Sequence, residues 1–221
     1  MQSRNAGPPG ELSTIHICTI EELRSFYRHP RSGSVDKEHA SINGHDRAFI
    51  AHAPLMILAT SDADGRCDVS PKGGPPGFVS VLDDGRVAIP DLSGNNRLDS
   101  MQNLLTNPGI GLLFLIPGID ETLRVNGRAV LSTDPDVLAV CAIRDVGTKV
   151  AIAVKVEQVY LHCAKALRRG SVWQPEAWPD SSDVPSAARM LRDQVSPEVD
   201  VGLVAQSLED GYSTTLWKSG G

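Results

Sequence analysis

Short apolar and alternating runs separated by turn residues fill the chain from Ala51 to Leu131, and a further run follows. They predict β-strands at Leu55–Thr60, Arg66–Lys72, Phe78–Leu82, Arg86–Ile89, Ile110–Ile116, Thr122–Leu131 and Lys149–His162. Turn residues at Asp62–Gly65, Asp83–Gly85 and Pro117–Asp120 predict hairpins between three pairs of these strands. Strands at such regular spacing are typical of a barrel or sandwich and not of alternating βαβ units.

Helical periodicity lies on both sides of this region and between some of its strands. Near the start, Thr19–Glu22 fits a capping box. Leu23, Phe26 and Tyr27 follow on one helical face, and a polar stretch through His45 then predicts a loop with at most one further helical turn. Other helices are predicted at Arg97–Thr106, Asp136–Ile143, Pro185–Val195 and Pro197–Asp210, the last ended by Gly211. The whole pattern predicts a mainly β fold with helical additions, an α+β protein.

Composition narrows the class of protein further. The 221 residues are 41% hydrophobic and 22% charged, which fits one domain with decorations. A net charge of −6 argues against a protein that wraps duplex DNA or an anionic membrane surface. The longest apolar runs, Ala53–Thr60 and Ile110–Pro117, are too short to cross a bilayer, and Met1–Gly10 lacks the pattern of a secretory signal. We therefore expect a cytoplasmic protein.

Cysteine and histidine spacing gives little support to a metal site. The four cysteines, Cys18, Cys67, Cys141 and Cys163, form no C-x-x-C pair, so the pattern predicts neither a zinc site nor a disulfide framework. The six histidines never recur at i,i+3 or i,i+4. We expect reduced, structural thiols and no bound metal, with a thiol nucleophile as the alternative. The motifs of α/β-hydrolases, P-loop proteins and Rossmann folds are also absent.

The segment Pro90–Arg97 carries the most informative chemistry. A strand ends at Ile89, a loop of Ser, Gly and Asn follows, and a helix is predicted to begin near Arg97. The N-terminus of a helix is suited to bind an anion, and a cation placed there is unfavourable unless an anionic partner is present. The segment therefore predicts a phosphate site. The alternative is an ordinary N-cap loop with a solvated arginine.

The strand Arg66–Lys72 has one polar face, formed by Asp68, Ser70 and Lys72. Gly73–Gly77 follows directly and allows close approach of the backbone to a flat ligand or a simple turn. Pro71 removes a ladder donor, so we expect an edge or bulged position. The polar face either lines a site or faces water.

Two further polar segments are candidates for ligand binding. The strand Thr122–Leu131 places Arg124, Asn126 and Arg128 on one face, where they bind an acidic ligand or face water. Lys72, Arg97 and Arg124 all lie in or beside the β-rich region of an otherwise acidic chain, which favours the ligand. The segment His162–Trp173 combines cations with a tryptophan, for stacking on a planar heterocycle or for packing on the barrel.

The order of these motifs resembles the pyridoxamine 5′-phosphate oxidase-like superfamily of FMN-binding split barrels, and within it the group of probable FMN-dependent proteins. The motifs that carry the resemblance are Asp68–Gly73, Pro90–Arg97, Asn107-Pro108 and Arg124–Ala129. The resemblance divides the chain into a leader and helix (1–50), an FMN-binding split β-barrel (51–178) and a C-terminal helical extension (179–221).

The resemblance also implies the cofactor contacts. It places the isoalloxazine ring of FMN against one strand and the end of the next, and the phosphate at the following helix start. The implied residues are Asp68, Val69, Ser70, Pro71, Lys72, Pro90 and Asp91 for the ring, and Ser93, Asn95, Asn96 and Arg97 for the phosphate. The implied site lies at a homodimer interface, where the other subunit adds Trp173 and Lys165 or Arg168. To these we add Arg124 from its charge and position.

The sequence departs from the true oxidase in the regions that bind its substrate. Neither Cys141–Gly147 nor the tail after Trp178 reproduces the substrate-binding elements of that enzyme. We therefore expect an FMN-dependent oxidoreductase that acts on an unidentified small molecule, and we assign no catalytic acid or base. The alternatives are a flavin carrier or redox sensor without turnover, and a haem-handling split barrel with His162 or Cys163 as axial ligand.

Overall fold

The computed structural model describes residues 16–220, so the predicted leader Met1–Gly10 lies outside the described residues. The chain divides into two compact units between Lys37 and Glu38. In the first unit, helix α1 (Ile20–Phe26) begins where the capping motif predicts, because the Thr19 hydroxyl accepts a hydrogen bond from the Glu22 backbone N–H at 3.1 Å. One further turn, α2 (Ser32–Val35), follows as expected.

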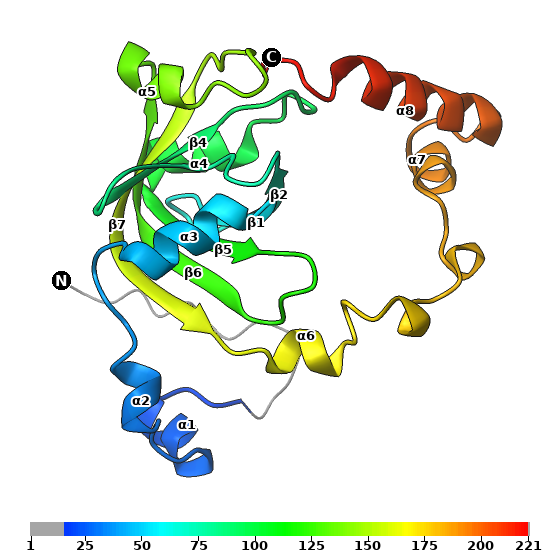
Figure 1. Ribbon diagram of the computed structural model, residues 1–221. Helices are drawn as coiled ribbons and strands as arrows, with labels where there is room; N and C mark the ends of the chain where they lie inside the picture. Colours follow the sequence, from blue (N-terminus) through cyan, green and yellow to red (C-terminus); the bar gives the residue numbers. More distant parts are fainter. Residues whose placement is uncertain (1–15, 221) are drawn as a thin grey trace. The chain divides into compact units, whose positions relative to one another are not determined.

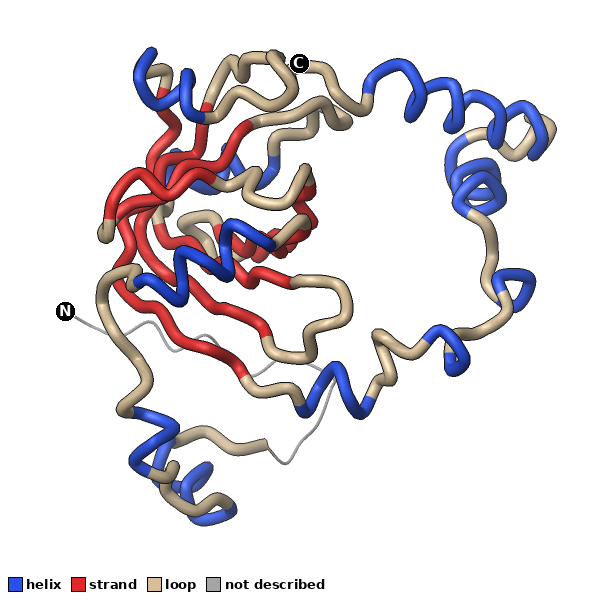
Figure 2. The backbone as a smooth tube through the Cα atoms, in the orientation of Figure 1, coloured by secondary structure: helices blue, strands red, loops and turns tan. Residues whose placement is uncertain are grey.

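The second unit is built on one seven-stranded antiparallel sheet (Figures 1 and 2). The strands are β1 (Leu55–Ser61), β2 (Cys67–Gly73), β3 (Ser80–Asp83), β4 (Arg86–Pro90), β5 (Gly109–Leu115), β6 (Thr122–Ser132) and β7 (Ala151–His162). Their order across the sheet is β2-β1-β5-β6-β7-β4-β3. This confirms the mainly β fold with helical additions, and Pro71 lies in the edge strand β2, as its missing N–H predicts.

Helices connect and extend this sheet. They are α3 (Gly44–His52), α4 (Asp99–Thr106), α5 (Pro135–Val140), α6 (Lys165–Arg169), α7 (Ala187–Val195) and α8 (Val201–Thr215), with 3-10 turns η1 (Pro175–Ala177) and η2 (Ser181–Asp183). α4 packs against β1, β2 and β6, and α7 packs against α8. None of the helices within residues 16–220 has the length and apolar character needed to cross a membrane.

Two helical predictions were wrong. The sequence predicted a loop through His45, but α3 begins at Gly44 under a capping box formed by Asn43 and Asp46. The polar capping residues there resemble a loop. In the tail, α8 begins after Asp200 and continues past Gly211, which therefore does not end the helix.

The main core lies on one face of the sheet, where alternate residues of β1, β5, β6 and β7 are buried, and a small cluster of Ala88, Cys141 and Ala151 lies on the other face. Directly paired residues of neighbouring strands project to the same face. The buried row Met56, Phe114 and Leu123 therefore continues at the edge of the sheet into Lys72, which pairs with Met56. The pairing brings the polar face of β2 to the same side as the core.

Candidate functional site

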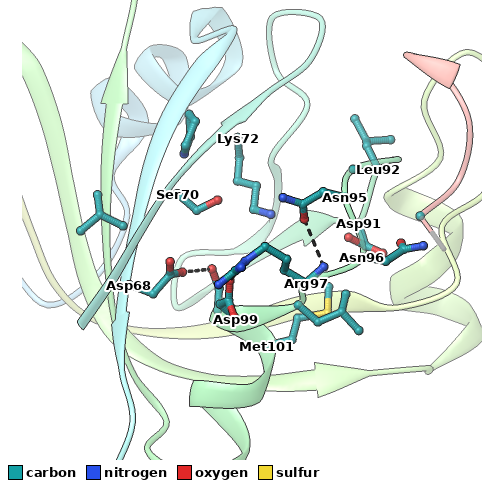
Figure 3. Close-up of a pocket in the computed structure, with 16 residues that line it drawn as sticks. Asp68, Ser70, Lys72, Asp91, Leu92, Asn95, Asn96, Arg97, Asp99 and Met101 are labelled. Carbon is teal, nitrogen blue, oxygen red and sulfur yellow. Dashed lines mark hydrogen bonds and ion pairs between the residues drawn. The ribbon is translucent and has the colours of Figure 1, made fainter. Parts of the chain in front are cut away.

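A cavity of about 220 Å³ lies between β2 and the segment from Asp91 to Met101 (Figure 3). β2 forms one wall, the loop after β4 and the first turn of α4 form the other, and Gly220 closes part of the rim. Its lining residues are Asp68, Val69, Ser70, Pro71, Lys72, Asp91, Leu92, Gly94, Asn95, Asn96, Arg97, Leu98, Asp99, Ser100, Met101 and Gly220. Two segments selected from the sequence, Asp68–Lys72 and the loop before Arg97, thus meet in one place.

The polar face of β2 points into this cavity. Asp68, Ser70 and Lys72 are half-buried, whereas Val69 on the opposite face is 65% exposed. This is the reverse of an ordinary edge strand with apolar residues inside and polar residues in water. Of the two interpretations of this face, the structure supports the lining of a site. In Figure 3, Lys72 extends from β2 toward Asn95 and Arg97 of the opposite wall.

The loop that faces β2 has an unusual backbone. Asn96 (φ 56°) and Leu98 (φ 58°) both adopt the left-handed conformation, which is uncommon for residues other than glycine and particularly for leucine. The Asn95 side-chain oxygen accepts a hydrogen bond from the Arg97 backbone N–H at 3.1 Å. Residues held in such conformations cluster at ligand-binding sites, where the surrounding structure supports them.

The position of Arg97 corrects one prediction. The sequence placed it in the first helical turn, but α4 begins at Asp99 because Leu98 interrupts the helical backbone. The Arg97 guanidinium bonds the Asp99 carboxylate at 2.7 Å, with 71% of its side chain exposed. An exposed ion pair of this kind contributes little to stability, so Arg97 exchanges partners at low cost.

Hydrogen bonds fix α4 against the sheet. The Ser100 hydroxyl, which is buried, donates to the Asp68 carboxylate at 2.5 Å, and this joins α4 to β2. Asn103 donates to Thr60 of β1 at 3.1 Å, and Asn107 donates to Ser61 at 3.0 Å. No local sequence pattern indicates Ser100, because its role depends on a carboxylate 32 residues away. These bonds give the cavity a fixed wall.

Asp91 is a carboxyl group of the site whose pKa is shifted by burial. Its burial raises the pKa of the Asp91 carboxyl above the ordinary value, and the positive charges of Lys72 and Lys149 act in the opposite direction. Its backbone N–H donates to the Thr148 hydroxyl at 3.0 Å, which attaches the loop to the segment before β7. Thr148 was not selected from the sequence either.

A second cavity, of about 380 Å³, adjoins the first, and the two share Ser70, Pro71, Lys72, Leu92, Gly94 and Asn95. Its lining residues are Ser70, Pro71, Lys72, Gly73, Phe78, Pro90, Leu92, Ser93, Gly94 and Asn95. Every site residue predicted on β2 and on the loop after β4 therefore lines one cavity or the other.

Three other predicted residues line neither cavity. Arg124 lies on the opposite face of the sheet, where it donates to the Tyr160 hydroxyl at 2.8 Å. The Trp173 indole donates to the Ile119 carbonyl at 2.9 Å, on the turn between β5 and β6, and Lys165 begins α6 nearby in sequence. The assignment of Trp173 and Lys165 to the cofactor site of a second subunit stays a prediction, as does the assignment of Arg124 to the cofactor site.

The antiparallel sheet and its edge cavity define a split-barrel protein. Residues 42–163 match the sequence model of the family described as pyridoxamine 5′-phosphate oxidase, and the chain belongs to that family. The match ends before α6, so α6, α7 and α8 lie outside it.

Solved structures with a similar arrangement come from several bacteria. HupZ of Group A Streptococcus is 19% identical, with 54% of this chain and 93% of that chain covered and a TM-score of 0.45. A putative pyridoxamine 5′-phosphate oxidase from Lactobacillus delbrueckii is 20% identical, with 55% of this chain and 95% of that chain covered and a TM-score of 0.43. An FMN-binding protein from Syntrophomonas wolfei is 12% identical, with 52% of this chain and 82% of that chain covered and a TM-score of 0.39. No curated protein matches the chain.

Proposed function

We propose that this chain binds FMN in the two adjoining cavities and acts as an FMN-dependent oxidoreductase on a small organic molecule. The observation that carries the proposal is that β2 and the loop after β4 together line two adjoining cavities, with Lys72 among the residues common to both. The first cavity is polar and lies beside Arg97, and the second includes the buried Phe78. A ligand with a charged phosphate and a flat heterocycle matches that division.

The donors around the first cavity fit a phosphate. Asn95, Asn96 and Arg97 lie on its rim, and Ser93 precedes them. Guanidinium groups form short, charge-assisted hydrogen bonds with phosphate oxygens. Arg97 is held near the cavity by a single exposed carboxylate, Asp99, so a phosphate of higher charge competes well for it. These residues would hold the phosphate group of FMN.

The second cavity fits the ring system. Phe78 and Pro90 supply buried apolar surface, and β2 supplies backbone and the Lys72 ammonium group. Bound FMN supplies hydride and single-electron transfer, which no side chain provides. Lys72 would stabilise negative charge at the N1 and O2 edge of the ring. The family membership of residues 42–163 supports flavin as the ligand.

We further propose that the chain forms a homodimer through the outer face of the sheet. Val69 and Pro71 are exposed there, and Pro71 is in register with the half-buried Ile57 and Leu113. An edge strand that turns its apolar side chains outward is typical of a surface that another chain covers. Arg124 is the next residue in that row.

The test is the absorbance spectrum of the purified chain before and after addition of FMN. Bands near about 370 and 450 nm that stay with the protein through gel filtration support flavin binding, and a haem Soret band or no retained flavin contradicts it. Lys72→Met is expected to lower the affinity for FMN. Lys155→Met, at an exposed position of β7, is the matched control and should leave the affinity unchanged. Anaerobic addition of NADH or NADPH then separates an oxidoreductase, whose flavin is bleached, from a carrier, whose flavin is not.

A further inference from the structure

The residues that follow α8 return to the candidate site. Ser219 forms an antiparallel bridge with Leu92, next to β4. The Ser93 backbone N–H donates to the Lys218 carbonyl at 3.0 Å, and the Gly220 N–H donates to the Asp91 carbonyl at 3.4 Å. Figure 3 includes this segment, in pale red, beside Asp91 and Leu92. A short strand from the end of the chain thus pairs with the loop that lines both cavities.

Trp217 anchors this strand on its other side. Its ring packs against the hydrophobic core, and the Arg144 guanidinium carbon lies 3.9 Å from the ring centroid. Arg144 and Asp145 both have positive φ, and hydrogen bonds join Ile143 to Val146 in both directions. These features define a tight turn of the hairpin type, which holds Arg144 in place. The strand is therefore fixed by side-chain packing as well as by its backbone.

Gly220 makes the closest approach to the site. It is buried, it lines the first cavity, and a Cβ atom at this position would overlap the Asp91 carboxylate. No side chain fits there without displacing Asp91. The absence of a side chain at Gly220 therefore leaves the space that the Asp91 carboxylate occupies.

We propose that Trp217–Gly220 is a clasp that holds the loop Asp91–Leu98 in the conformation that binds FMN, with Trp217 and Gly220 as positioning residues. The clasp lies outside the region matched by the family, residues 42–163. The loop contains two left-handed residues, Asn96 and Leu98, and such conformations persist only when surrounding structure supports them. The identity of the ligand, FMN, rests on the function proposed above, whereas the contacts by which the clasp supports the loop are independent of it.

The clasp couples the end of the chain to the ligand. If the loop binds FMN only when the clasp is closed, the apparent dissociation constant rises as the closed fraction falls. By thermodynamic reciprocity, FMN must also stabilise the closed clasp. Two regions more than 100 residues apart in sequence, around Ser93 and around Gly220, then gain protection from hydrogen exchange together.

The test uses the full chain with Gly220→Ala, and Gly211→Ala as the matched control, because a Cβ at Gly211 meets open space. A second variant ends at Leu216 and removes the clasp without a clash. Both clasp variants are expected to bind FMN about tenfold or more weakly than wild type and to lose the protection of the Ser93 amide from hydrogen exchange. The control should match wild type in both measurements. The melting temperature of each variant reports whether the barrel itself has been damaged.

Separate outcomes overturn the two proposals. If both clasp variants bind FMN as tightly as wild type and keep the Ser93 amide protected from hydrogen exchange, the proposed role of the clasp is wrong. If the wild-type chain binds no FMN, the proposed function is wrong. Hydrogen exchange of the ligand-free chain then still tests whether the clasp supports the loop. In that case the reporter is the Arg97 backbone N–H, because its acceptor, the Asn95 side chain, lies within the loop. Unchanged protection of Arg97 on removal of the clasp contradicts the role of the clasp, and lost protection supports it.

Discussion

Lys72 and Arg124 lie on opposite faces of the same sheet. Lys72 is in register with Met56, Phe114 and Leu123 on the core face, and Arg124, the residue after Leu123, therefore projects outward. The sequence suggests both as cofactor residues, but within one protomer their side chains project to opposite sides of the sheet. A flavin held by Lys72 would contact Arg124 only from a second copy of the chain.

The proposed dimer is tested at Val69. Val69→Glu places a charge on the exposed apolar side of β2 and is expected to convert a dimer into a monomer, because burial of an unpaired carboxylate is unfavourable. Gel filtration with light scattering should give twice the chain mass of 23.6 kDa for wild type and that mass for the variant. Val140→Glu, at an exposed position of α5, is the control. A wild-type protein that runs as a monomer would remove the dimer proposal.

The bond between Ser100 and Asp68 should contribute to stability. Ser100→Ala leaves the half-buried Asp68 carboxylate without this donor and is expected to lower the free energy of unfolding by about 1–2 kcal/mol. Urea denaturation measures the change. Ser207→Ala, on the exposed side of α8, should have no such effect. Equal stability of the Ser100 variant and wild type would mean that α4 is held by other contacts.

Asp91 gives the protein a specific dependence of stability on pH. Burial raises the pKa of its carboxyl in the folded chain above the ordinary 3.8, so between the two values the folded state binds more protons than the unfolded state. The contribution of this group to stability therefore falls as pH rises through that window. Asp91→Asn removes the effect, and its stability relative to wild type should increase from acid toward neutral pH.

Denaturation curves at a series of pH values measure this difference. Asp64→Asn, at an exposed turn residue, serves as the control for a lost negative charge. A difference between the Asp91 variant and wild type that stays constant with pH, or decreases as pH rises, would contradict the assignment.

Gly127 allows β6 and β7 to approach at a bulge. The register shifts between Asn126 and Gly127, and a Cβ at Gly127 would overlap the Lys155 carbonyl oxygen and lie 3.3 Å from the Val156 Cα. Because the opposing atoms are backbone, Gly127→Ala should cost about 3 kcal/mol. Gly147→Ala, where a Cβ meets nothing within 4 Å, should be tolerated. Similar thermal midpoints for the two variants would show that the bulge relaxes easily.

The strands could be predicted because their signal is local. Alternation along β6 predicted its buried and exposed faces, and the hairpin turns predicted the neighbouring pairs β1–β2 and β5–β6. α3 was missed because Gly44, His45 and the polar cap resemble a loop. The shifted start of α4 depends on the left-handed Leu98, which no local pattern indicates.

The site was predictable only in its segments. Polar residues in β2 and the loop after β4 were visible in the sequence, and the cavities bring them together. The bond from Ser100 to Asp68 and the approach of Gly220 to Asp91 join distant parts of the chain. The outward direction of Arg124 requires the register of several strands. Such relationships depend on tertiary pairing, so composition and spacing do not contain them.

The central claim is that the loop at Ser93–Arg97 holds the phosphate of FMN while β2 holds its ring, and the most direct measurement compares FMN with riboflavin. Equilibrium titration of wild type and Arg97→Ala with each ligand gives the four dissociation constants, with Arg66→Ala, an exposed arginine of the hairpin after β1, as control. We predict that loss of the Arg97 guanidinium raises the dissociation constant of FMN by about 10- to 100-fold and leaves that of riboflavin nearly unchanged. Equal losses for both ligands, or no loss for either, would contradict it.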